Sequence, residues 1–209
     1  SLEQYTYRKQ NNSLYGSFNV GWNHFLYMDA RLHGDQSSTL PTNNNVYVYP
    51  SFSGSFVFSE LTKLGNLLPY GKLRMSWAQV GSDTDPYQLG LVYTKSKFTY
   101  PGYTIGYIYN NTIPNKDLKP TRTNSFEIGI ETKFLNNRMG LDITYYSQKS
   151  KNQIMGMASS WTSGYTYRLI NAGEIDNKGL EIALNTRPIQ TKDFSWDLNF
   201  NFSKNSNKV

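Results

Sequence analysis

The sequence predicts an all-β fold, specifically an antiparallel transmembrane β-barrel section. Three observations predict it. Apolar and polar residues alternate through most of the chain, aromatic residues make up 15% of it, and short connections alternate with long ones. Alternation is typical of strands with one apolar face, and aromatic residues form the girdles of membrane barrels.

The clearest alternation covers residues 124–147. Phe126, Ile128 and Ile130 share one face of the first strand, while Glu127 and Glu131 lie on the other. The alternation resumes after a turn at 135–138 and places Met139, Leu141, Ile143 and Tyr145 on one face. This pattern predicts a β-hairpin. A soluble sandwich would bury the apolar face in its core, whereas a membrane barrel would turn it toward lipid and the charges toward a wet lumen.

The same pattern recurs along the chain. Apolar residues at alternate positions mark six further segments: 14–22, 26–32, 52–58, 73–77, 180–184 and 194–202. We therefore expect about eight strands of about nine to eleven residues, the length that a tilted strand needs to cross a bilayer.

The connections between these segments fall into two length classes. Short ones lie near 23–24, 61–71, 135–137 and 187–193, and long ones near 34–50, 82–122 and 149–177. Outer-membrane barrels have short periplasmic turns and long extracellular loops. The two classes therefore predict which end of each strand faces the cell exterior.

Composition excludes several other classes of protein. Hydrophobic residues make up 38% of the 209 residues, and the mean hydropathy is −0.59. No apolar run approaches the roughly 18 residues of a membrane helix, so any membrane span must be a strand. Cysteine is absent, which excludes disulfides and cysteine-ligated metals. The net charge of +6 is spread along the chain, which argues against a nucleic-acid partner.

Two sets of candidate site residues follow from this fold. Aromatic side chains in the long loops offer contact area for a ligand or a partner protein, or they pack against each other. These are Tyr87, Tyr93, Tyr100, Tyr103, Tyr107, Tyr109, Trp161, Tyr165 and Tyr167. Charged side chains on the polar strand faces are expected to face the barrel lumen. These are Asp29, Arg31, Arg74, Glu127, Glu131, Asp142, Glu181 and Asp197.

No arrangement in the sequence predicts catalysis, a cofactor or a metal. His24 and His33 lack a nearby nucleophile, and His24 fits a polar turn position. Asp83-Thr84-Asp85 offers oxygen atoms to Ca²⁺ but lacks the EF-hand pattern. Glu127 and Glu131 are separated by roughly 13 Å along a strand. A retaining glycosidase needs its two carboxylates about 5–5.5 Å apart.

Several segments together resemble the barrels of SusC/RagA-type TonB-dependent transporters of Bacteroidetes. They include Ser37–Pro41, Gly71–Ser76, Val80–Asp83, Leu118–Gly129, Asn171–Glu181 and Phe194–Asn205. Each segment is weakly specific alone, but their order across nearly the whole chain is specific. One departure is the Pro120-Thr121 step, which more often reads Pro-Glu in this family.

The resemblance implies that residues 1–209 are a middle-to-late part of a barrel with about 22 strands around a plug. The plug domain, TonB box and signal peptide are expected to lie outside this chain. The resemblance also implies an outer-membrane importer without covalent chemistry. Its partners would be membrane lipid, TonB, a SusD-like surface lipoprotein that serves as a lid, and an oligosaccharide or peptide ligand.

Two alternatives remain open at this stage. One is a small, complete eight-stranded outer-membrane barrel that acts as an adhesin or structural protein. The other is a soluble, carbohydrate-binding β-sandwich, which the loop aromatics favour. Extraction separates them, because a sandwich dissolves in buffer and a barrel requires detergent.

Overall fold

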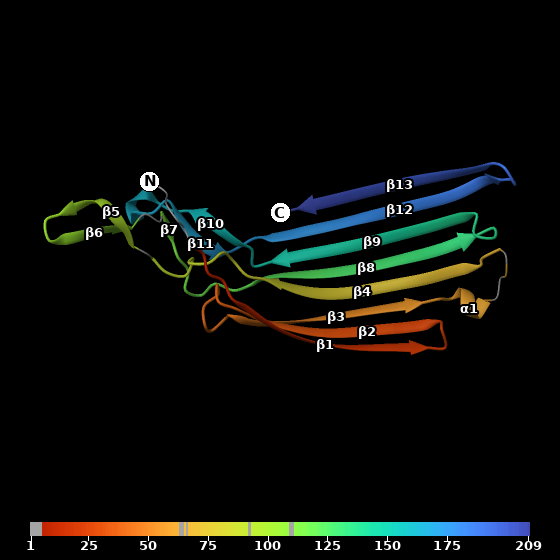
Figure 1. The fold of residues 1–209 in the computed structure, drawn as a ribbon, viewed down its shortest axis with the longest axis horizontal. Helices are drawn as coiled ribbons and strands as arrows, with labels where there is room; N and C mark the ends of the chain where they lie inside the picture. The colour runs from red at the N-terminus through yellow and green to blue at the C-terminus, as the bar shows by residue number, and fades with distance from the viewer. Residues whose placement is uncertain (1–5, 63–64, 66, 92, 109–110) are drawn as a thin grey trace.

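The computed structural model describes residues 6–62, 65, 67–91, 93–108 and 111–209. Its main feature is one eight-stranded antiparallel sheet (Figure 1). The strands are β1 (Asn11–Trp22), β2 (Leu26–Ser37), β3 (Val46–Phe56), β4 (Tyr70–Ser82), β8 (Thr121–Phe134), β9 (Met139–Lys151), β12 (Glu174–Gln190) and β13 (Ser195–Lys208). The expected antiparallel barrel strands are therefore confirmed.

The strands are longer than the sequence predicts. They contain 11 to 17 residues, because the ladders continue past the apolar stretches toward the long-loop end. Neighbouring strands keep exchanging backbone hydrogen bonds there, which satisfies polar groups that would otherwise need water.

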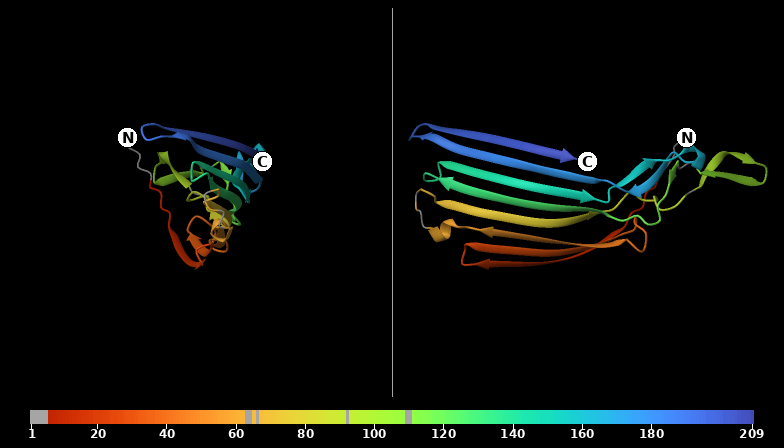
Figure 2. Two further views of the ribbon diagram at one scale, coloured as in Figure 1. Left: turned by 90° about the vertical axis from the view of Figure 1, so that its right-hand side faces the viewer. Right: turned by 180° about the vertical axis from the view of Figure 1, so that it is seen from behind.

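The sheet curves but does not close. Its strand order is β1-β2-β3-β4-β8-β9-β12-β13, so β1 and β13 form its two edges. Seen end-on, the strands form an open arc (Figure 2). Among the described residues no ladder joins the two edges. This arrangement fits a section of a larger barrel and differs from a complete barrel of eight strands.

Tight turns join the strands at the short-connection end. Asn23 and His24 have φ values of 44° and 60°, and the Phe25 amide donates to the Trp22 carbonyl over 3.2 Å. Two left-handed central residues define a type I′ turn, which suits the twist of a hairpin. At the predicted 135–138 turn, Leu135, Asn136 and Asn137 also have positive φ. The short helix α1 (Ser59–Thr62) lies between β3 and β4.

The long connections contain strands that the sequence analysis did not predict, and one of them is shorter than expected. The first is reduced to residues 38–45, because β2 and β3 extend into it. The other two contain further strands: β5 (Tyr93–Tyr100), β6 (Tyr103–Ile108), β7 (Thr112–Ile113), β10 (Ile154–Ala158) and β11 (Tyr167–Asn171). They form a β5–β6 hairpin and a β10-β11-β7 sheet beyond one end of the main sheet (Figures 1 and 2). Threonine, tyrosine and isoleucine favour strands, and pairing satisfies their backbone groups.

One face of the main sheet is apolar and uncovered. The strand register aligns apolar side chains across it, for example in the row Phe56, Leu73, Ile130, Ile143, Ile182 and Phe202. Phe18 is 69% exposed and Phe200 is 60% exposed. A soluble sandwich would cover this face with a second sheet. Among the described residues no helix is long and apolar enough to cross a membrane.

The buried core of the chain is small and lies at the long-loop end. Leu40, Tyr47 and Leu118 are its buried members, and Leu89 and Leu169 pack against them. This core joins the β2–β3 loop to the segments that follow β4 and precede β8. We call this end of the chain, beyond the main sheet, the loop lobe: residues 38–45, 83–91, 93–108, 111–120 and 152–173.

Candidate functional site

All the charged residues that we expected to face the lumen lie on the same face of the main sheet. The register pairs Ser76 with Glu127, Glu131 with Asp142, and Thr144 with Glu181. By the same alternation this polar face carries Asp29, Arg31, Arg74, Glu127, Glu131, Asp142, Glu181 and Asp197. It lies opposite the apolar face.

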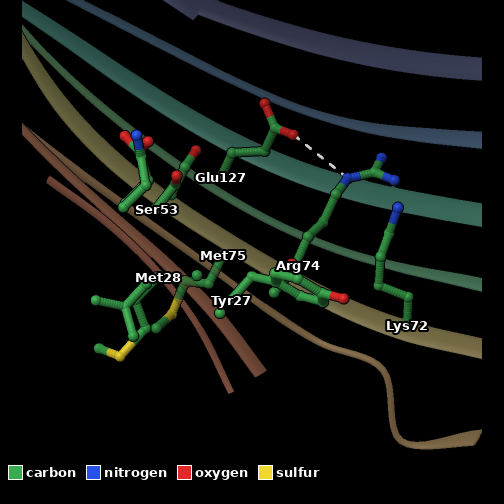
Figure 3. A pocket seen from close by; sticks show the side chains of 14 residues that line it. Tyr27, Met28, Ser53, Lys72, Arg74, Met75 and Glu127 are labelled. Atoms are coloured by element: carbon green, nitrogen blue, oxygen red, sulfur yellow. Dashed lines mark ion pairs between the residues drawn. The ribbon is translucent and has the colours of Figure 1, made fainter. Parts of the chain in front are cut away.

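Hollows mark the polar face as the concave one. One has a volume of about 560 Å³, and its lining includes Tyr27, Ser53, Lys72, Arg74 and Glu127 (Figure 3). Two further hollows are lined mainly by residues of the same face on β8, β9, β12 and β13. In a closed barrel the concave face surrounds the lumen. That these side chains line a lumen remains a prediction.

An arginine at the centre of this face joins three strands. The two terminal nitrogens of Arg74 donate to the Asp142 carboxylate over 2.8 and 2.9 Å, and Arg74 also donates to the Thr144 hydroxyl. The Glu127 carboxylate lies 3.7 Å from Nε (Figure 3). Such a two-pronged pair fixes orientation as well as charge.

Gly129 of β8 gives Arg74 the room to reach β9. A Cβ atom at Gly129 would lie 2.7 Å from Nε of Arg74, closer than real Cβ contacts allow. Arg74 and Gly129 are direct register partners, so the arginine crosses over the glycine toward Asp142. Gly129, which lies on the polar face of β8, is therefore part of the site.

Other charges on this face are also paired. Lys72 contacts Glu131 at 2.8 Å, and Arg187 contacts Asp197 at 2.6 Å. Arg31 pairs with Asp29 at 2.9 Å on the same strand. Such exposed pairs contribute little to stability, but they leave a hydrated surface with mixed charge. Lys72 and Arg187 were not among the predicted site residues. Lys72 could have been found, because it alternates with Leu73, whereas Arg187 lies in a segment that we expected to be a short connection and that the structure assigns to β12.

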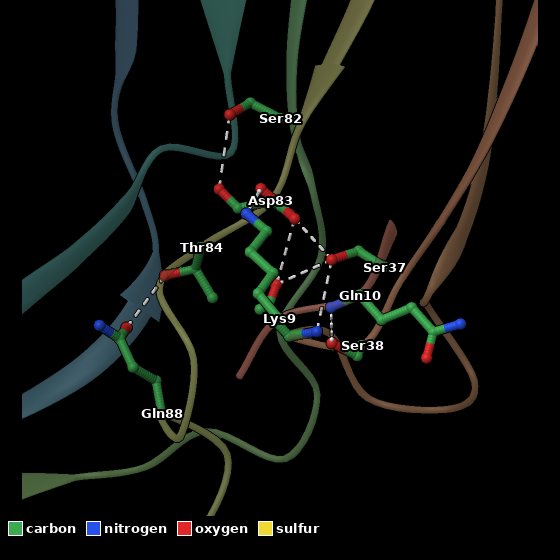
Figure 4. A network of polar contacts seen from close by, with 9 residues as sticks. Lys9, Gln10, Ser37, Ser38, Ser82, Asp83, Thr84 and Gln88 are labelled. Atoms are coloured by element: carbon green, nitrogen blue, oxygen red, sulfur yellow. Dashed lines mark hydrogen bonds and ion pairs between the residues drawn. The ribbon is translucent and has the colours of Figure 1, made fainter. Parts of the chain in front are cut away.

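A second polar cluster ties the N-terminal segment to the loop lobe (Figure 4). Lys9 Nζ lies 2.7 Å from Asp83 Oδ1, and the Ser37 hydroxyl donates to the other carboxylate oxygen. The Thr39 hydroxyl donates to that oxygen over 3.3 Å. Burial alone would raise the pKa of Asp83, but Lys9 and Ser37 stabilise the anion and hold its pKa below the ordinary value.

This cluster also bears on the calcium hypothesis. The Asp83 carboxylate is engaged by Lys9 and two hydroxyl groups, so its oxygens are committed to a protein network. Among the described residues no group of three or more histidine, cysteine, aspartate or glutamate side chains is placed to hold a metal ion.

The loop aromatics divide between two parts of the lobe. Tyr93, Tyr100, Tyr103 and Tyr107 lie on the β5–β6 hairpin, and Trp161, Tyr165 and Tyr167 lie on or beside the β10–β11 connection. Tyr87 follows β4, and Tyr109 lies outside the described residues. The exposed fractions are 82% for Trp161, 76% for Tyr93 and 73% for Tyr103. The expectation that they bind a ligand or partner stays a prediction.

Some of these aromatic rings do contact each other. The ring centroids of Tyr100 and Tyr103 lie 6.4 Å apart, and Tyr87 lies at the same distance from Tyr7 of the N-terminal segment. These contacts leave most of the ring surface in water, because Tyr100 and Tyr87 are 67% and 53% exposed. Mutual packing therefore explains only part of the aromatic content of the loops.

The two histidines differ in their surroundings. His24 is a turn residue, as the sequence predicts. His33 lies on β2, where Nε2 is 3.1 Å from Asp35 Oδ1 and the ring is 4.8 Å from that of Tyr49. This grouping was not predicted, although His33 and Asp35 share one strand face.

Comparison with known proteins decides the family. The family model described as "TonB dependent receptor-like, beta-barrel" matches residues 2–208. The chain belongs to the TonB-dependent receptor β-barrel family. The predicted resemblance and the outer-membrane location are thereby confirmed.

Individual relatives agree with this assignment. TonB-dependent receptor P26 of Formosa agariphila is 27% identical over 200 residues, covering 94% of this chain and 20% of the relative. TonB-dependent receptor SusC of Bacteroides thetaiotaomicron is 27% identical over 218 residues, covering 99% of this chain and 22% of the relative. The chain thus spans about a fifth of the length of these relatives.

Solved structures share the fold. The RagAB peptide transporter superposes with a TM-score of 0.86 at 24% identity, covering 96% of this chain and 22% of that one. The siderophore receptor PirA of Pseudomonas aeruginosa gives a TM-score of 0.61 at 20% identity, covering 95% of this chain and 35% of that one.

Proposed function

We propose that this chain is eight strands of the barrel wall of an outer-membrane importer. The parent protein would take up an oligosaccharide or a peptide, draw energy from TonB and work with a SusD-like surface lipoprotein. The plug would lie elsewhere in the parent protein. The family membership and the similarity to SusC and RagAB support this proposal.

The observation that carries the proposal is the two-sided sheet. Its concave face is charged, hollowed and internally paired, and its convex face exposes rows of apolar side chains. A barrel with water inside and lipid outside satisfies both faces at once. Its two unpaired edges require further strands, since open sheet edges are not tolerated in lipid.

The alternatives fit the structure less well. A complete eight-stranded barrel would pair β1 with β13, and a carbohydrate-binding sandwich would cover the apolar face. Neither arrangement is present among the described residues. The transport role therefore explains more of the structure.

We propose that the preferred substrates are oligosaccharides and that peptides are the alternative substrate class. The exposed aromatic rings of the loop lobe provide flat apolar surfaces that can stack on sugar rings. The peptide class enters because RagAB is described as a peptide transporter. We further propose that import involves no covalent step, since the family consists of receptors.

Uptake by cells tests both classes. A strain that lacks the parent receptor would be complemented with the wild type or with the double variant Tyr100→Ala and Tyr103→Ala. Growth would be measured on oligosaccharide mixtures and on peptide mixtures as sole carbon source. We expect the wild type to restore growth on one class only, and the variant to slow that growth. If the wild type restores growth on neither class, the importer proposal is wrong.

A further inference from the structure

Positively charged side chains gather on the apolar, convex face at one end of the sheet. On β8, β9, β12 and β13, lysine or arginine follows the apolar residues toward the loop lobe, on the same face. We call this group the outer basic patch: Arg122, Lys149, Lys151, Lys178, Lys204 and Lys208. The register brings them together, because Lys151 is the partner of Arg122 and Asp176 is the partner of both Lys149 and Lys208.

The outer basic patch begins where the apolar rows end. Lys178 lies two residues beyond Leu180, and Lys149 lies four residues beyond Tyr145. At about 3.3 Å per residue these offsets are about 7 and 13 Å along tilted strands. The headgroup layer on each side of the hydrocarbon is about 5–8 Å thick. Lys178 and Lys204 therefore lie at the depth of the lipid headgroups when the apolar rows lie in hydrocarbon. The other four cations lie four to six residues beyond the apolar rows, at the outer boundary of the headgroup layer or above it.

Acidic neighbours neutralise only part of the patch. Glu174 contacts Lys149 at 2.5 Å and Lys151 at 3.4 Å, and Asp176 contacts Lys178 at 2.9 Å. Six cations and these two carboxylates leave a net charge of +4. Among the described residues no carboxylate lies within ion-pair distance of the other three cations, which are Arg122, Lys204 and Lys208.

The rest of the convex face provides an internal comparison. At the same end of β1 to β4 the corresponding positions hold only uncharged residues: Asn12, Leu14, Gly34, Gln36, Val46, Val48, Gln79 and Gly81. At the opposite end of β8 and β9 the convex face holds Thr132, Phe134 and Met139. A surface charged only for solubility would not concentrate its cations on four adjacent strands at one end.

We propose that the outer basic patch binds phosphate-bearing lipid headgroups of the outer leaflet. Lysine and arginine at this depth attract anionic headgroups, and arginine binds phosphate with two parallel hydrogen bonds. The proposal rests on the proposed orientation, with the loop lobe outside the cell, and is independent of the imported substrate.

Lipid retention by the full-length receptor tests the proposal. Native mass spectrometry would count diphosphorylated lipid A molecules bound to receptor purified in detergent, with phosphatidylcholine as the uncharged comparison. The test variant combines Arg122→Gln, Lys204→Gln and Lys208→Gln, which leaves no carboxylate without its partner. The control variant removes the same charge at the other end through Lys133→Gln, Arg138→Gln and Lys192→Gln.

We expect the test variant to bind lipid A about fivefold more weakly for each charge removed, while the control matches the wild type. Replacing Lys204 and Lys208 by arginine should preserve binding, because the charges are kept. Heat-modifiable migration on gels should show that the glutamine variant is folded. Binding by the test variant at the wild-type level would overturn the proposal. The same loss of binding in the test and control variants would also overturn it. Competition by inorganic phosphate as effective as lipid A would also overturn it, because the site would then recognise free phosphate. Uptake of substrate should be unchanged in the test variant. A failure of the lipid-binding proposal can therefore be distinguished from a failure of the importer proposal.

Discussion

At the scale of single residues, the chain uses glycine to let long side chains cross between strands. Arg74 passes over Gly129 to reach Asp142, and the ring of Tyr146 lies over Gly179 on the next strand. In each pair the two residues are direct register partners. These cross-strand contacts fill the polar face without a second layer of protein.

Gly129→Ala is expected to destabilise the full-length receptor by about 1 kcal/mol, because the new methyl group displaces Arg74 from its half-exposed partner Asp142. The denaturant midpoint of unfolding in detergent measures this effect. Gly140→Ala is the matched control, since its Cβ would meet no atom closer than 3.9 Å. In an Arg74→Ala background the Gly129 substitution should cost nothing. A cost that persists there would show that Arg74 is not the obstacle.

Asp83 gives the N-terminal segment a dependence on pH. Its pKa in the folded chain lies below the ordinary value of 3.8, so its stabilising effect is present above that value. The effect is lost as the pH falls through the lowered pKa, when the carboxylate takes up a proton and its contact with Lys9 weakens.

We expect a spin label at Arg8→Cys to be immobile at neutral pH and mobile in strong acid. With Asp83→Asn it should be mobile at both. A label that stays immobile in this variant would contradict the assignment.

At the scale of elements, the β5–β6 hairpin is separate from the barrel wall. It forms its own two-stranded sheet and projects beyond the rest of the loop lobe in Figure 1 and in the right-hand view of Figure 2. Its exposed rings include Phe98 at 83% and Tyr93 at 76%. The wall therefore does not depend on the hairpin for its ladders.

Replacing residues 94–107 by a short Gly-Ser linker should leave the receptor folded and inserted in the outer membrane. Heat-modifiable migration on gels would report folding, and surface labelling would report insertion. We expect uptake of the substrate to fall, because the exposed rings are lost. Loss of insertion would show instead that the hairpin is part of the structural wall.

At the scale of the whole molecule, this chain is a section of a barrel wall that we expect to be insoluble in water without the rest of the barrel. Both edge strands offer unpaired backbone groups, and the convex face exposes large apolar side chains. Unpaired edges and apolar patches both promote association between copies.

Residues 1–209 expressed alone should therefore pellet from buffer and dissolve only in detergent or denaturant. Ultracentrifugation of a lysate with and without detergent makes this measurement. A monomer that is soluble in plain buffer would favour the sandwich and contradict the barrel wall.

The sequence by itself determined the eight strands of the main sheet, their two faces and the end that carries the long connections. Period-two alternation is a local property, so Glu127, Arg74 and Asp142 could be assigned to one face from their positions alone. The same signal could not show that Arg74 reaches Asp142. The two residues lie on β4 and β9, which are separated by β8, and only the strand order of the sheet brings them near each other.

Only the tertiary structure decided three other features. It showed that the long connections contain strands, that Lys9 reaches Asp83, and that the cations of β8, β9, β12 and β13 form one patch. Each depends on the register between segments far apart in the chain, which no local pattern encodes. Alternation gives the face of every side chain, but strand pairing gives its neighbours.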